Sequence, residues 1–243
     1  YSLAAAAAAL RQMSQARHVG KVVVSNSLSS QPCARLGRVV VTGGLGALGS
    51  LVAAWLSSHG VQQLQLLGRA GKLQHSSSIL QLLGTNGSSS QVIISQCDGG
   101  SSEDLAAAIN NSGSSGLLPV ELILHAGGVL ADATLQQQQL RGVRQVVAAK
   151  LSPVAGLLCA CAQQPVRSVV LFSSVASLLG SPGQSNYAAA NAGLDAAATS
   201  AQVCGIPAVS VQWGAWSGGG MAAGYVQTAA RVERMGMSLI SPA

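Results

Sequence analysis

The sequence predicts one α/β domain in which a doubly wound parallel sheet of about six strands lies between two layers of helices. Short runs rich in β-branched residues alternate six times with helix-forming runs, a pattern typical of parallel strands joined by right-handed crossovers. A glycine cluster follows the first β-branched run and opens a helix, as in dinucleotide-binding Rossmann folds. Apolar residues make up 49% of the chain, which is enough for the core of such a domain.

Two segments precede this domain. Residues 1–24 combine a strong helix former at 4–16 with a β-branched strand at 22–24. Residues 25–36 are rich in serine and contain a proline, as expected of a linker between domains. Because the chain opens with Tyr1 rather than methionine, we expect it to be a part of a longer protein.

The glycine cluster is the clearest candidate for a cofactor site. It lies between a strand that starts at residue 38 and an apolar helix over 47–56. Glycines at this point let the backbone approach a pyrophosphate, and the helix N-terminus offers free N–H groups to it. A glycine-rich turn that binds no ligand is the alternative. The expected cofactor contacts here are Thr42, Gly43, Gly44, Leu45, Gly46 and Gly49.

The end of the second strand indicates which dinucleotide would bind. This strand, 64–67, is followed by Gly68 and Arg69, where NAD-binding sequences carry an acidic residue for the ribose. Arg69 can pair with a 2′-phosphate, which favours NADPH over NADH. A solvated surface arginine is the alternative. We expect a helix within 72–90 before the next strand.

The third and fourth strands end at the same edge of the sheet. The third strand, 92–96, leads to Asp98, which can accept a hydrogen bond from adenine, cap the helix over 101–110, or do both. The fourth strand, 121–125, runs into small residues beside which a ribose can pass close to the backbone. The expected cofactor contacts at this point are His125, Ala126, Gly127 and Gly128.

Helices over about 136–150 and 153–162 follow the fourth strand. Lys150 lies in a largely apolar stretch, VVAAKLSPVAGLL, where a lone lysine usually extends its ammonium to solvent. The sixth strand, 208–213, ends in Trp213 and Gly214, two further expected cofactor contacts, and a glycine tract at 218–220 is a candidate lid.

The stretch LFSSVASLLGSPGQSNYAAAN, which joins the fifth strand to its helix, holds the most informative side chains. Ser174 follows the apolar run 168–172, and Tyr187 starts a helix-forming run thirteen residues later, after a turn signal at 180–183. A loop can bring both hydroxyls to one carbonyl oxygen, as the reduction of a carbonyl requires. A strand, a loop and a helix with a core tyrosine form the alternative.

Composition excludes several classes of function. The net charge of +6 comes from 13 basic and 7 acidic residues with no basic run, so we expect a phosphorylated cofactor or an acidic partner and no nucleic acid. No apolar run reaches about 18 residues, and no basic segment precedes an apolar core near residue 1, so we expect neither a membrane span nor a signal peptide. Five cysteines without a CxxC pattern indicate reduced thiols and no metal site. We therefore expect the protein in the cytoplasm, or in an organelle stroma if the full-length protein is targeted.

In combination, the motifs resemble the ketoreductase domain of type I reducing polyketide synthases, a branch of the short-chain dehydrogenase/reductase superfamily. Residues 1–24, with the turn HVGK, resemble the C-terminal tail of an enoylreductase domain. The implied organisation is this tail, a linker at 25–36, and a ketoreductase catalytic subdomain at 37–243 that lacks the last strand of its sheet. The motifs that carry the resemblance, over residues 37–240, are TGGLGALG, LLGRAG, CDG, HAGGVL, AAKLSPVAGL, FSSVASLLGSPGQSNYAAANAGLDA and QWGAWSGGGMA.

The resemblance implies a catalytic set of four residues: Lys150, Ser174, Tyr187 and Asn191. Free-standing short-chain reductases place a lysine four residues after the tyrosine, where this chain has Asn191. Polyketide ketoreductases exchange the two residues, and the lysine comes from the preceding helix, which implies a catalytic Lys150. Tyr187 would then donate the proton and Ser174 would orient the carbonyl. Lys150 would favour the phenolate and hold the ribose hydroxyls, and Asn191 would position Lys150 or a water.

The implied reaction is the NADPH-dependent reduction of a β-ketoacyl thioester to the β-hydroxyacyl thioester within a multidomain polyketide or fatty acid synthase. The implied partners are a phosphopantetheinylated acyl carrier protein that holds the β-ketoacyl chain, the enoylreductase domain and the structural subdomain of the ketoreductase. A non-catalytic reductase scaffold and a free-standing short-chain dehydrogenase are the alternatives.

Family signatures also bear on the configuration of the product. Leu130-Ala131-Asp132 matches a Leu-x-Asp signature, and Leu179 occupies the position of a tryptophan eight residues before the tyrosine. Both features favour the class that gives the D-configured, B-type alcohol. The expected substrate and stereocontrol residues are Leu130, Asp132, Leu179 and Met221.

Overall fold

The computed structural model describes residues 5–15, 36–71, 90–110, 116–217, 236 and 238–241. The chain divides into two compact units, Tyr1–Ala34 and Arg35–Ala243. In the first unit, the helix expected at 4–16 is α1, Ala6–Ser14. The strand expected at 22–24 and nearly all of the expected linker lie outside the described residues.

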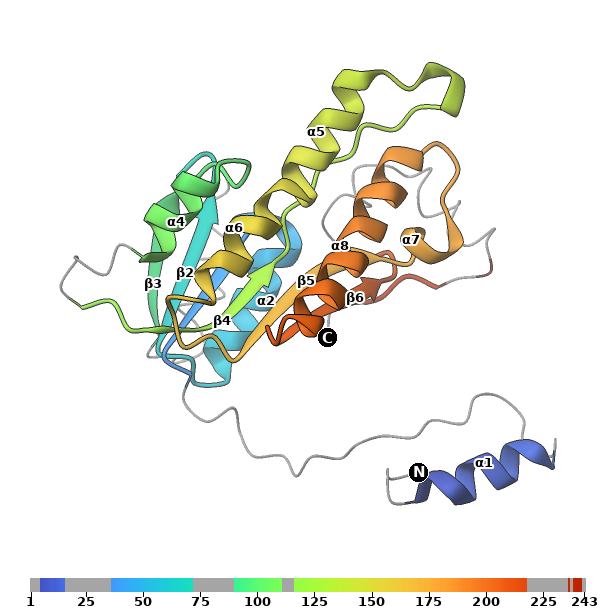
Figure 1. The fold of residues 1–243 in the computed structure, drawn as a ribbon, viewed down its shortest axis with the longest axis horizontal. Coiled ribbons are helices and arrows are strands. Elements are labelled where there is room, and N and C mark those ends of the chain that lie inside the picture. Colours follow the sequence, from blue (N-terminus) through green and yellow to red (C-terminus); the bar gives the residue numbers. More distant parts are fainter. Residues whose placement is uncertain are drawn as a thin grey trace. The chain divides into compact units, whose positions relative to one another are not determined.

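The larger unit is built on a parallel sheet of six strands in the order β3-β2-β1-β4-β5-β6, which confirms the doubly wound fold class (Figure 1). The chain moves outward from β1 to β3 and then crosses back to place β4 on the other side of β1. Ligands of such sheets bind at the carboxyl ends of the strands, where the order reverses. The strands are β1 (Arg38–Thr42), β2 (Gln63–Gly68), β3 (Gln91–Gln96), β4 (Val120–His125), β5 (Ser168–Ser174) and β6 (Ala208–Trp213).

The central strand β1 is buried along its whole length because helices cover both of its faces. Its valines alternate between two core clusters, with Val40 in one and Val39 and Val41 in the other. The cluster of Val40 packs against α4 (Ser102–Asn110), α6 (Ser152–Ala160) and α8 (Ser185–Val203). The opposite cluster packs against α2 (Ala47–Ser58). The three-layer arrangement that the sequence predicts is therefore present.

Two helical segments differ from the sequence prediction. The helix expected over 136–150 is divided into the 3-10 turn η2 (Leu135–Gln137) and α5 (Leu140–Lys150), because Gln138 and Gln139 adopt extended backbone angles. A one-turn helix that the sequence did not indicate, α7 (Ala176–Leu179), follows β5 and ends at Gly180, which has a φ of 72°. The helix expected within 72–90 and the lid expected at 218–220 lie outside the described residues.

The stretch Leu140–Ala160 is long and apolar enough to cross a membrane, with a mean hydropathy of 1.3 over its most apolar window. It comprises α5 and α6, which belong to the helical layer over the sheet (Figure 1). Buried side chains of α6, such as Leu157, join the main core cluster, which accounts for the apolar character of this segment within the fold.

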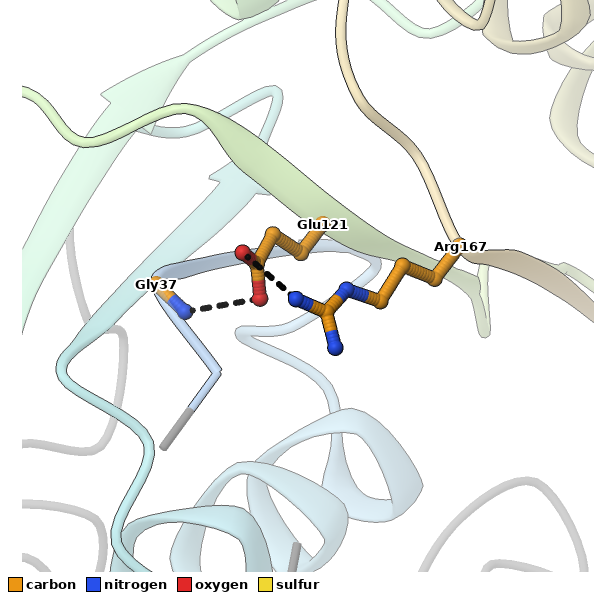
Figure 2. A network of polar contacts seen from close by, with 3 residues as sticks. All are labelled: Gly37, Glu121 and Arg167. Atoms are coloured by element: carbon orange, nitrogen blue, oxygen red, sulfur yellow. Dashed lines mark hydrogen bonds and ion pairs between the residues drawn. The ribbon is translucent and has the colours of Figure 1, made fainter. Parts of the chain in front are cut away.

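The amino-terminal edge of the sheet is held by a small polar network around Glu121 (Figure 2). The Glu121 carboxylate accepts a hydrogen bond from the Gly37 N–H at 3.2 Å and forms an ion pair with Arg167 at 3.3 Å. These contacts join the starts of β1, β4 and β5. Because the Arg167 side chain is 64% exposed, its ion pair contributes little to stability.

Candidate active site

The strand register places the sequence-predicted side chains along the carboxyl edge of the sheet. Thr42 of β1 pairs with His125 of β4, and His125 pairs with Leu171 of β5. Ser174, the last residue of β5, pairs with Trp213, the last residue of β6. Helices α5 and α8 add Lys150, Tyr187 and Asn191 to this edge.

Lys150 does not extend to solvent, contrary to the usual behaviour of a lone lysine in an apolar stretch. Its side chain is buried with 3% exposure, and its Nζ donates a hydrogen bond to the carbonyl of Phe172 at 2.8 Å. The same nitrogen lies 5.3 Å from the centre of the Tyr187 ring. Burial lowers the pKa of Lys150 to about 8, against the opposing effect of the Asp195 carboxylate. The ammonium therefore remains largely protonated at neutral pH and lies beside the phenol.

Tyr187 lies in the first turn of α8 with its phenol mostly buried. Burial raises the pKa of this phenol, while hydrogen bonding from Asn191 and Ser174 acts to lower it, and the Asp132 carboxylate raises it further. The net pKa is raised, whereas the resemblance led us to expect an ammonium that favours the phenolate. A raised pKa keeps the hydroxyl protonated at neutral pH, as a proton donor requires.

Asn191 lies one helical turn after Tyr187 and is completely buried. Its Nδ2 donates to the carbonyl of Tyr187 at 2.8 Å. Its Oδ1 has no hydrogen-bond donor among the described residues, although the atom is buried. A buried acceptor without a partner is costly, so this oxygen can accept from a bound water or an ammonium.

Asp195 is a functional candidate that the sequence reasoning missed. Its carboxylate accepts hydrogen bonds from Ser177 after β5 at 2.7 Å, and from Ser210 and Gln212 of β6 at 2.6 and 2.8 Å. Burial opposes its ionisation, but these donors outweigh that effect and lower the pKa of Asp195. The carboxylate thereby fixes α8, which carries Tyr187, to the strands beside it. The spacing of 187, 191 and 195 places all three residues on one helix face and could have indicated this role.

The glycine loop has the geometry of a pyrophosphate site. Gly43 has a φ of 67°, and a Cβ there would lie 2.7 Å from the N of Gly127. A Cβ on Gly49 would overlap the carbonyl oxygen of Gly43. Among the described residues, α2 has no side-chain cap and no acidic residue in its first turn, so no side chain of that turn satisfies its first N–H groups. These features fit a dinucleotide whose pyrophosphate accepts from the N-terminus of α2.

Arg69 and Asp98 lie where the sequence placed them, after β2 and β3. Both are exposed, and both line one hollow beside β3 and α4. Asp98 accepts a hydrogen bond from the N–H of Gly100 at 3.0 Å and so shapes the turn before α4. The cap of α4 is Ser101, whose hydroxyl accepts from the N–H of Asp104 at 3.1 Å. Capping of this helix by Asp98 itself is therefore not observed.

Thr42 and His125 are expected to contact the cofactor, but their side chains are buried and bonded within the protein. The Thr42 hydroxyl lies 2.5 Å from Nδ1 of His125, and Nε2 of His125 lies 2.8 Å from the carbonyl oxygen of Lys150. Any contact of these two residues with a cofactor would thus come from their backbone. The loop after β4 packs closely against the His125 ring, since a Cβ on Gly127 would lie 3.2 Å from Cε1 of His125.

The loop after β4 is tied to the turn that precedes Tyr187. The Asp132 carboxylate accepts from Nε2 of Gln184 at 3.0 and 3.2 Å, and the Asn186 side chain donates to the carbonyl of Ala131 at 2.8 Å. Leu130 is half-buried in the same loop, and Leu179 on α7 is exposed. Met221, the remaining expected substrate contact, lies outside the described residues.

Aromatic side chains close the end of β6. The Trp213 ring lies 5.5 Å from the Phe172 ring and 5.3 Å from the Trp216 ring, measured between centroids. A Cβ on Gly214 would contact Ile240, which forms a parallel bridge with Trp216. The segment around Trp213 and Gly214 is thus held at the carboxyl edge, beside Ser174.

Comparison with known proteins agrees with this geometry. Residues 37–218 match the model of the KR domain. Polyketide synthase GfsB of Streptomyces halstedii is 39% identical over 206 residues, which cover 85% of this chain and 4% of that protein. The phenolphthiocerol synthesis polyketide synthase type I Pks15/1 of Mycobacterium marinum is 35% identical over 98% of this chain and 11% of its own length.

Solved structures show the same fold. A structure described as that of A-type ketoreductases from a modular polyketide synthase superposes with a TM-score of 0.77 at 34% identity. The match covers 85% of this chain and 43% of that one. The chain therefore spans less than half of that structure and a small part of the synthases it is similar to.

Proposed function

Because this chain belongs to the KR domain family, which it shares with modular polyketide synthases, we propose that it is an NADPH-dependent ketoreductase. Its substrate is a β-ketoacyl thioester carried on the phosphopantetheine arm of an acyl carrier protein, and its product is the β-hydroxyacyl thioester. The observation that carries this proposal is the convergence of Lys150, Ser174, Tyr187 and Asn191 at the carboxyl edge of the sheet.

The protein's part in the reaction is to stabilise and protonate the carbonyl oxygen. When bound, the reduced nicotinamide supplies a hydride to the β-carbon of the substrate. As negative charge develops on the carbonyl oxygen, the hydroxyls of Ser174 and Tyr187 donate hydrogen bonds to it. Tyr187 then transfers its proton to that oxygen, and the raised pKa of its phenol ensures that the proton is present.

Lys150 and Asn191 support the loss of this proton. The Lys150 ammonium, 5.3 Å from the ring centre, favours the phenolate that Tyr187 becomes. The Oδ1 of Asn191, which has no donor in the described part of the chain, accepts from a water or from this ammonium and so holds the proton source in place. The N-terminus of α2 would hold the pyrophosphate of the cofactor, and Arg69 would pair with its 2′-phosphate.

We further propose that residues 1–24 are the tail of an enoylreductase domain, joined by the linker 25–36 to the ketoreductase subdomain at 37–243. The similarity to Pks15/1 over 98% of the chain supports a synthase origin for both parts. Neighbouring synthase domains and an acyl carrier protein are then the partners. The loop of Leu130 and Asp132, together with Leu179 and Met221, would set the B-type configuration of the alcohol.

Turnover of a β-ketoacyl thioester by a protein completed at both ends tests this function. The parent protein should oxidise NADPH in step with substrate, and Tyr187→Phe should not. Arg167→Ala, which alters the opposite edge of the sheet, is the control and should retain the parent rate. Equal oxidation of NADPH by the parent and by Tyr187→Phe would reject the mechanism. Separation of the product enantiomers would test the B-type assignment.

A further inference from the structure

The junction between α5 and α6 leaves a backbone carbonyl without a helical partner. In a continuous helix, the carbonyl of Lys150 would accept from the N–H of Val154. That N–H instead bonds to the carbonyl of Leu151 at 3.1 Å, as α6 begins with Ser152 and Pro153. The carbonyl of Lys150 is therefore one of the last carbonyls of α5, which have no N–H partner within the helix, and it requires another donor.

His125 supplies this donor from the end of β4. Its Nε2 lies 2.8 Å from the Lys150 carbonyl oxygen, and the ring is 1% exposed. A carbonyl only accepts hydrogen bonds, so Nε2 carries the proton and Nδ1 accepts from the Thr42 hydroxyl on β1. The Lys150 carbonyl thus fixes the tautomer of His125, and the Thr42 hydroxyl, which can donate or accept, holds the ring by donating to Nδ1. Burial and the nearby ammonium lower the pKa of His125 to about 4, despite the bond to the Lys150 carbonyl, so the ring stays neutral at ordinary pH.

Lys150 is consequently held at both of its ends by neighbouring strands. His125 of β4 binds its carbonyl, while the carbonyl of Phe172 on β5 accepts from its Nζ at 2.8 Å. These two bonds determine where the ammonium lies relative to Tyr187. The ionisable groups that face the lysine are His125 from β4 and Tyr187 and Asp195 from α8.

We propose that His125 is a positioning residue for Lys150: its Nε2–H, on a ring held at Nδ1 by Thr42, fixes the end of α5 and thereby the ammonium beside Tyr187. This inference rests on the proposed reductase function for its catalytic consequence. The position of the lysine itself can be tested without cofactor or substrate.

The direct test is to measure the pKa of the Lys150 ammonium in the protein without cofactor. The titration is monitored by NMR through the chemical shifts of the lysine Cε and Nζ. The chain has only three lysines, so the signal that disappears in Lys150→Met identifies Lys150. In the parent it should titrate near the pKa of about 8 that burial imposes. In His125→Phe, which has no donor, the lysine is released toward water and its pKa should rise toward the ordinary value of 10.5.

Matched variants separate positioning from packing. His125→Gln retains an N–H donor and should keep the pKa of Lys150 close to the parent value, as should Arg167→Ala. Thr42→Val removes the hydroxyl that donates to Nδ1, which loosens the ring and should raise the pKa of Lys150, whereas Thr42→Ser keeps this donor and should not. If His125→Phe does not fold, comparison of Thr42→Val with Thr42→Ser tests the position of Lys150 while the His125 ring is retained.

Turnover gives the second readout. A displacement of the ammonium by about an ångström should lower kcat by roughly 100-fold in His125→Phe, and His125→Gln should recover most of this loss. In a Lys150→Met background, His125→Phe should cause no further loss. A folded His125→Phe protein with an unchanged pKa of Lys150 would overturn the proposal, and so would an equal loss of kcat in both backgrounds. An inactive parent protein would instead reject the reductase function and leave the lysine titration as the test.

Discussion

Replacement of Lys150 by methionine removes the ammonium from the site while it preserves much of the buried volume. The ammonium lies 5.3 Å from the centre of the Tyr187 ring. If this distance is taken as the separation of the two charges, an effective dielectric constant of about 20 gives an attraction of about 3 kcal/mol between the ammonium and a phenolate. This attraction forms only as Tyr187 loses its proton. Without the ammonium, the activation barrier of proton transfer should rise and kcat should fall by roughly 100-fold.

The assay is kcat at saturating NADPH and saturating β-ketoacyl thioester, so that weaker cofactor binding does not enter the comparison. The melting temperature should change little, because removal of a buried charge offsets the loss of the hydrogen bond from Nζ to the Phe172 carbonyl. Arg167→Ala, at the other edge of the sheet, serves as the control for general damage. A loss of kcat below about threefold in a folded Lys150→Met protein would refute the electrostatic role of the lysine.

Three further predictions concern other parts of the structure. The pKa of His125 is lowered from 6.5 to about 4, so between these pH values the unfolded chain binds more protons than the folded one. The free energy of unfolding should therefore fall by about 3 kcal/mol as the pH drops from 6.5 to 4. His125→Gln should remove this part of the pH dependence, measured by thermal unfolding. Asp195→Ala removes an acceptor that three side chains share, of which Ser177 and Gln212 keep a second acceptor. It should reduce the free energy of unfolding by about 1–2 kcal/mol, measured with urea, and a change below about 0.5 kcal/mol would contradict its role in fixing α8. Arg69→Ala should weaken NADPH binding at least tenfold more than NADH binding in a calorimetric titration, and equal weakening would remove Arg69 from the 2′-phosphate.

The sequence was sufficient for the sheet because its strands are short, β-branched and separated by turn signals. The sixth strand, predicted at 208–213, is Ala208–Trp213, and the glycine cluster begins α2 as expected. The short helix α7 escaped prediction because four residues carry too little periodicity to be recognised. The division of the helix before Lys150 depends on the backbone angles of Gln138 and Gln139, for which the sequence has no proline or glycine signal.

The site was predictable to the extent that single residues carry family signatures. Ser174 and Tyr187 drew attention through the chemistry of paired hydroxyls, and Lys150 only through the resemblance. The role proposed for His125 could not be predicted from the sequence, because it depends on a carbonyl left free at a helix junction and on a hydroxyl from another strand. The raised pKa of Tyr187 was missed for a similar reason, since the extent of burial outweighs the pattern of charges.

The most direct test of the central claim is the mass of the acyl chain after incubation with NADPH deuterated at the transferable position. A parent protein completed at both ends should convert the β-ketoacyl thioester on its carrier protein to a β-hydroxyacyl chain that contains one deuterium at the β-carbon. Tyr187→Phe should leave the β-ketoacyl chain unchanged over the same time. Absence of deuterium at the β-carbon in the parent, or equal labelling by Tyr187→Phe, would contradict the assignment of this site as a ketoreductase centre with Tyr187 as its proton donor.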